Sequence, residues 1–145
     1  MTGRLRALLV RRDGGSRWGY VPALPVLAYF SRLGLHEGIL AALYLMALLV
    51  VCAVQLFRPT LLGWALLTVL FVLFTASILV TADFYVSHGV PIDRGQYILF
   101  LACGAVPSAT LLLARPRMQA GERGAALLAL ILASLIVAPL FAPIL

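Results

Sequence analysis

Long apolar runs separated by short polar segments organise this sequence. The longest run, residues 60–82, carries no charged side chain between Arg58 and Asp83. As an α-helix it would be about 35 Å long, which is enough to cross a hydrocarbon layer of about 30 Å. A soluble protein of this size could rarely bury every face of such a helix away from water. We therefore interpret this run as a transmembrane helix.

Four further stretches of similar character surround it. Three are long enough to span a bilayer, and they cover residues 38–57, 95–114 and 124–145. The link at residues 58–60 is so short that the helices on either side of it should form an antiparallel hairpin. The remaining stretch, 18–35, has an uncharged core of only about 21 Å if helical. It reaches further only if Arg32 extends to the head groups, so it is a short span, a re-entrant hairpin or an interfacial helix.

This pattern predicts an all-α, polytopic integral membrane helical bundle with four transmembrane helices and a short or re-entrant N-terminal membrane segment. Residues 18–145 form a single bundle. Residues 1–17 form a basic cytoplasmic or interfacial leader, which is either a short surface helix or a frayed tail. A hydrophobic content of 63% and a mean hydropathy of +1.08 are typical of an integral membrane protein.

Charge decides the expected topology. All eleven basic residues are arginines, and the net charge is +6. Five crossings would place nine arginines on one side and only Arg32 and Arg94 on the other, whereas four crossings would divide them seven to four. The positive-inside rule favours five crossings, a cytoplasmic N-terminus and an external Leu145. The absence of lysine suggests GC-rich coding, and hence a bacterial inner membrane.

The arginines explain the basic charge without nucleic acid, because no soluble domain presents a basic face. We expect them to bind lipid head groups. The predicted anchors are Arg4, Arg11, Arg12, Arg17, Arg58, Arg115, Arg117 and Arg123.

Small residues at helical spacing predict where helices approach closely. Gly104 and Ser108 form a small-xxx-small pair, and Ala125, Ala129 and Ala133 form a ridge one turn apart. These five are the predicted helix-packing residues.

Polar and ionisable side chains cluster at the expected outer face. That face would present Arg32, His36, Glu37, Asp83, Tyr85, His88, Asp93 and Arg94. Asp83 and His88 are the candidate catalytic residues, because a carboxylate and an imidazole could exchange a proton or hold a cation near neutral pH. The alternative is that these residues only mark helix ends at the interface. No metal motif is present, and we interpret Cys52 and Cys103 as small packing residues.

The membrane runs contain no ionisable side chain if Arg32 reaches the head groups, which argues against a pump or a haem protein. Aromatic residues in these runs could line a groove for a lipid tail or a quinone, or could simply fill the core. They are Tyr44, Trp64, Phe71 and Phe74. No cofactor motif is identifiable.

The segment from 37 to 114 resembles the DoxX-like and related small four-helix membrane families. The resemblance is carried by Leu56-Phe57-Arg58-Pro59 at the end of a hairpin helix, by His88, and by Gly95-Gln96-Tyr97 opening another helix. It implies a four-helix membrane fold and no particular activity.

The favoured hypothesis is a non-catalytic integral subunit that scaffolds, stabilises or regulates a larger inner-membrane complex. Its partners would be membrane lipids and larger integral membrane proteins. The alternative is a small membrane enzyme or redox-linked factor that acts on a lipid or quinone at the outer face through Asp83 and His88.

Overall fold

The computed structural model describes residues 2–10, 17–117 and 121–141, and within these ranges the regular structure is helical without any strand. The elements are α1 (Thr2–Leu9), the 3₁₀ turn η1 (Arg17–Tyr20), α2 (Ala23–Glu37), α3 (Ile39–Phe57), α4 (Leu61–Ser87), α5 (Arg94–Leu113) and α6 (Arg123–Phe141). Helices α3, α4, α5 and α6 are each long and apolar enough to cross a membrane. The predicted all-α membrane bundle is confirmed.

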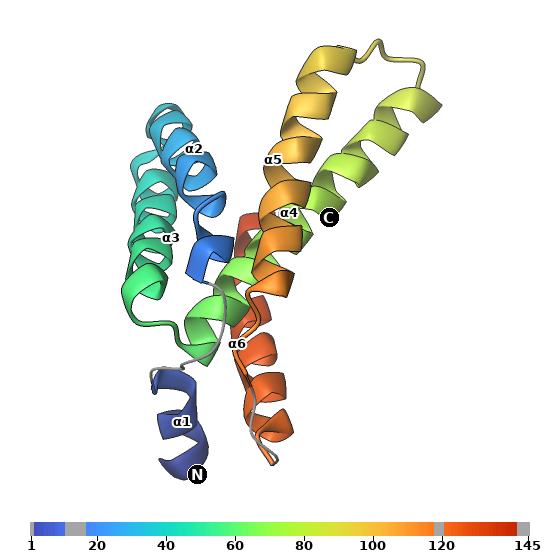
Figure 1. Cartoon of the computed structure of the whole chain (residues 1–145). Helices are drawn as coiled ribbons and strands as arrows, with labels where there is room; N and C mark the ends of the chain where they lie inside the picture. Colours follow the sequence, from blue (N-terminus) through green and yellow to red (C-terminus); the bar gives the residue numbers. More distant parts are fainter. Residues whose placement is uncertain (1, 11–16, 118–120, 142–145) are drawn as a thin grey trace.

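Helix α4 is the element around which the others assemble (Figure 1). It packs along α5 and α6, and its first turns also contact α3 and α1. Between Leu61 and Phe71 only Leu62 and Val69 are more than marginally exposed, whereas in the outer half of the helix only Ser77 is buried. The inner half of α4 is therefore the centre of the bundle, and its outer half lies at the periphery.

Helices α2 and α3 form an antiparallel hairpin (Figure 1). The turn between them is Gly38, whose φ of +148° is a conformation that L side chains rarely adopt. Close to this turn, a Cβ atom added at Gly34 would lie 3.3 Å from the backbone of Ala42, so glycine allows the two helices to approach. Helix α2 has 15 residues and is therefore about 22 Å long.

The predicted element boundaries need two corrections. The stretch expected at 18–35 opens with η1, and α2 itself begins only at Ala23, because Pro22 and Pro25 suit the start of a helix rather than its interior. The longest apolar run was predicted over residues 60–82, but α4 continues past Asp83 to Ser87. A charged residue at the membrane surface is solvated by water and head groups, so it does not end a helix.

Successive segments from α2 to α6 alternate in direction, which gives the bundle two chemically different ends (Figure 1). At the end that we call the basic end, Trp64 Nε1 donates to the Leu111 carbonyl (2.8 Å) and the Cys52 thiol donates to the Tyr20 carbonyl (3.5 Å). This end holds η1, the α3–α4 link, the end of α5 and the start of α6, with Arg17, Arg58, Arg115, Arg117 and Arg123.

The opposite end, which we call the polar end, holds the α2–α3 turn and the α4–α5 loop. Its residues include Arg32, His36, Asp83, His88, Asp93 and Arg94. Arg4 lies in α1, which packs on α6 and α4, while Arg11 and Arg12 lie outside the described residues.

A buried glutamine fixes the turn between α3 and α4. Gln55 is 3% exposed. Its Nε2 donates to Thr60 Oγ1 (2.9 Å), and its Oε1 accepts from the Thr60 N–H (2.7 Å). Thr60 Oγ1 in turn caps α4 by accepting from the Gly63 N–H (3.2 Å). Any Cβ at position 63 would collide with the Gln55 side chain, so Gly63 is required for this arrangement.

The two sets of small residues predicted to pack helices lie on faces that pack within this chain. Gly104 is buried, and a Cβ there would collide with Thr75 Oγ1 and lie 3.0 Å from the Phe74 ring. Ser108 donates to the Gly104 carbonyl (2.8 Å), and its Oγ lies 3.5 Å from Thr75 Oγ1. Helices α4 and α5 therefore cross closely at this point.

The alanine ridge plays the same role on α6. Ala125, Ala129 and Ala133 are 5%, 0% and 0% exposed, and α6 packs chiefly against α4. A hydrogen bond from the Tyr44 hydroxyl to the Ile136 carbonyl (2.7 Å) also ties α3 to α6. The ridge is thus an internal seam of the bundle.

Replacing Gly63 with Ala should destabilise the fold by about 1–3 kcal/mol, because the new methyl group displaces Gln55 and disrupts its hydrogen bonds to Thr60. The measurement is SDS-induced unfolding in mixed micelles. Gly95→Ala is the control, since its Cβ would meet only Asp93 Oδ1, at 3.4 Å. An unchanged unfolding curve for Gly63→Ala would contradict this account of the turn.

Replacing Ala129 with Leu should also cost about 1–3 kcal/mol, because the larger side chain separates α6 from α4. Ala138→Leu, at an exposed position of the same helix, should leave stability unchanged. The same unfolding assay on the isolated chain compares the two. Equal stabilities would show that the ridge does not pack inside the chain.

Candidate functional site

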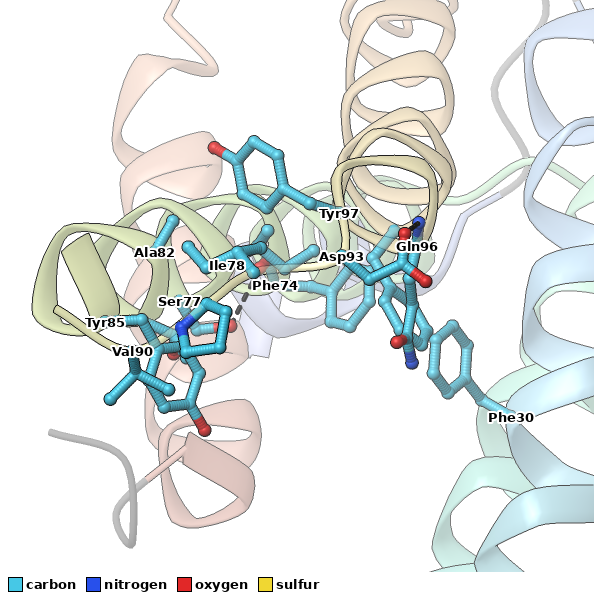
Figure 2. Close-up of a pocket in the computed structure, with 14 residues that line it drawn as sticks. Phe30, Phe74, Ser77, Ile78, Ala82, Tyr85, Val90, Asp93, Gln96 and Tyr97 are labelled. Atoms are coloured by element: carbon cyan, nitrogen blue, oxygen red, sulfur yellow. Dashed lines mark hydrogen bonds between the residues drawn. The ribbon is translucent and has the colours of Figure 1, made fainter.

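A cavity lies at the polar end, between the outer halves of α4 and α5. Its volume is about 600 Å³, which is within the usual range for small-molecule sites. The loop that joins the two helices closes one side, and Phe30 of α2 closes another (Figure 2). Because Gly104 and Thr75 hold the helices together deeper in the bundle, the cavity forms where α4 and α5 diverge.

Aromatic rings from three helices form much of the wall. The Phe30 ring lies edge-on to Phe74, with centroids 5.0 Å apart, and its centroid is 6.2 Å from that of Phe100. Tyr85 and Tyr97 also line the cavity (Figure 2). Such rings offer a large apolar surface together with electron-rich faces.

Two polar side chains of the wall are fixed by hydrogen bonds. Ser77 donates its hydroxyl to the Phe74 carbonyl of its own helix (2.8 Å). Asp93 is the N-cap of α5, where its Oδ1 accepts from the backbone N–H groups of Gly95 (2.9 Å) and Gln96 (3.3 Å). Among the described residues that line the cavity, Asp93 is the only charged one. Its carboxylate is therefore held at a defined place in the wall.

The candidate catalytic residues Asp83 and His88 are both exposed and lie outside this lining. The His88 ring stacks on Phe84, with centroids 4.1 Å apart, and its Nδ1 lies 2.8 Å from the Phe84 carbonyl oxygen. A carbonyl can only accept, so Nδ1 carries the proton. Five positions apart at the end of one helix, Asp83 and His88 face different directions. The structure does not assemble them, and their proton exchange stays a prediction.

The remaining polar residues predicted for this face are dispersed. Arg32 and His36 are exposed on α2, and Arg94 is exposed at the first position of α5. Of the predicted residues whose side chains the structure describes, Tyr85 and Asp93 alone line the cavity. The Glu37 side chain lies outside the description.

The predicted aromatic groove is also divided. Phe74 lines the cavity between α4 and α5, while Phe71 and Phe74 border a smaller apolar cavity of about 170 Å³. Trp64 and Tyr44 instead hydrogen-bond to backbone carbonyls within the bundle.

Sequence reasoning missed Phe30, Gln96, Tyr97 and Phe100 as residues of the site. One signal for its α4 wall was available, since the lining residues recur every three or four positions. They are Phe74, Ser77, Ile78, Thr81, Ala82 and Tyr85. This spacing marks a single helix face that mixes aromatic, small and hydroxyl side chains.

Within the described ranges, no group of three or more His, Cys, Asp or Glu side chains could hold a metal ion. Cys52 and Cys103 are free thiols, the first buried and the second partly exposed.

No family model, curated protein or solved structure matches the chain. The resemblance to DoxX-like proteins therefore stays a prediction.

Replacing Asp93 with Ala should destabilise α5 by about 1 kcal/mol, because two backbone N–H groups lose their acceptor. Asp93→Asn should retain most of that stability, since asparagine is an equally good N-cap. Unfolding in mixed micelles measures the difference. Equal losses in the two variants would show that Asp93 acts through its charge and not through the cap.

Proposed function

We propose that this multi-pass membrane protein is a non-catalytic integral subunit that scaffolds, stabilises or regulates a larger complex of the bacterial inner membrane. The observation that carries the proposal is the exposure of α5, of whose apolar membrane window only 17% is buried within the chain. Together with the outer half of α4 it extends away from the α2–α3 pair (Figure 1). This leaves a two-helix apolar face for lipids and for the helices of larger membrane proteins.

The arrangement of charge supports a cytoplasmic N-terminus. The basic end carries five of the nine arginines that five crossings would place inside, and the polar end carries Arg32 and Arg94. In this orientation the arginines of the basic end bind anionic head groups of the inner leaflet. Helix α2 then serves as a short crossing, with Arg32 reaching the outer head groups.

The cavity favours a second candidate, a small enzyme or redox-linked factor that acts on a lipid or a quinone at the outer face. Its aromatic wall and its place at the polar end suit an amphiphilic substrate. In this case Asp83 and His88 would act on a substrate that protrudes from the cavity, since neither lines it.

Purification of the tagged chain from its own host in mild detergent, followed by mass spectrometry, tests the first proposal. We expect a stoichiometric set of larger membrane proteins, because the apolar face of α4 and α5 is extensive. A homogeneous assembly of this chain alone would contradict the role as a subunit.

The variants His88→Ala and Asp83→Asn separate the two candidates. A subunit should retain both assembly and the activity of the complex, because both side chains are exposed and the His88 ring packs on Phe84 of its own helix. Loss of an activity with assembly intact would instead support the enzyme. The paired measurements are the yield of the purified complex and its turnover.

A further inference from the structure

The cavity between α4 and α5 extends from the hydrocarbon region to the head-group layer. Helix α4 has 27 residues and is therefore about 40 Å long, roughly 10 Å more than the hydrocarbon thickness. If the helix enters the hydrocarbon near Leu61, its residues beyond about Thr81 lie among the head groups. The cavity wall thus runs from Phe74 at hydrocarbon depth to Tyr85 and Asp93 at the surface. A molecule that fills it must be amphiphilic.

The deep part of the cavity suits an apolar body with rings. Phe30, Phe74 and Phe100 meet there, and the Ser77 hydroxyl is already donated to its own helix. No described side chain at this depth presents a charge. An apolar ring therefore gains contacts without leaving a buried polar group unpaired.

The charge at the mouth selects the head group. Asp93 is held in the wall by its two capping hydrogen bonds, and the neighbouring Arg94 does not line the cavity. A cationic head would meet the Asp93 carboxylate, and Tyr85 and Tyr97 also line the cavity. The face of an aromatic ring attracts cations. An anionic head would meet a carboxylate and no cationic lining residue.

We propose that this cavity binds amphiphilic organic cations, which place an apolar ring-bearing body between α4 and α5 and a positive centre beside Asp93. The site does not depend on whether the chain is a subunit of a complex.

Two probes of the same shape and opposite charge test the proposal directly. Tetraphenylphosphonium is a ring-bearing cation, and tetraphenylborate is its anionic counterpart. Equilibrium dialysis of the full chain in detergent, corrected for micelles without protein, should show saturable binding of the cation at about one per chain. The anion should bind at least about fivefold more weakly, as expected for one partly exposed charge contact.

Two pairs of variants separate charge from shape. Asp93→Asn preserves the N-cap, so it should leave the fold unchanged and weaken phosphonium binding about fivefold. Borate binding should not weaken, because the substitution removes the repulsion between the carboxylate and the anion. Ala82→Phe fills the cavity and should abolish binding of both probes. Ala76→Phe, at an exposed position of the same helix outside the lining, should leave both affinities unchanged.

Equal affinities for the two probes would overturn the proposal, as would a phosphonium affinity that Asp93→Asn does not change. Binding that survives Ala82→Phe would place the probe elsewhere on the chain and would also overturn it. Circular dichroism and the unfolding midpoint establish that each variant is folded before its affinity is compared.

Discussion

The close packing of small residues against α4 is the constraint on which the rest of the structure depends. Between helices in lipid there is no hydrophobic driving force, because lipid tails are as apolar as the side chains they would replace. Association then relies on van der Waals contact and hydrogen bonds, which require close approach. Gly63 provides it toward Gln55, Gly104 toward Thr75, and Ala129 along the seam with α6. These contacts join α3, α5 and α6 to the same helix.

The distribution of these contacts explains where the cavity forms. The buried residues of α4 are concentrated in its inner half, and Ser77 is the last of them. Past that point α4 and α5 diverge, and aromatic side chains with Phe30 of α2 surround the space left between them. The tight inner half therefore positions the site, and the outer half places it at the polar end.

The sequence predicts the helices well because apolar runs and membrane thickness are local properties. Helix α4 continues past the apolar run because Asp83 at a wet interface is compatible with a helix, which ends only near Gly89 with its φ of +66°. Gln55 lies within an apolar run, and its role depends on Thr60 across the turn. The cavity depends on which helices pair, since Phe30 and Tyr97 are far apart in the chain. Charged residues at loop ends, such as Asp83 and His88, occur at the membrane–water interface whether or not their side chains contact each other.

The central claim is that the chain crosses the membrane with five alternating segments, including the short α2, and with its basic end in the cytoplasm. Single cysteines introduced at Trp18, His36, Ser87 and Arg117, in a chain whose native cysteines are replaced by serine, test it most directly. In intact cells, a membrane-impermeant maleimide should label positions 36 and 87, and should label 18 and 117 only after permeabilisation. Labelling of 18 and 36 from the same side would contradict the account, because α2 would then not cross.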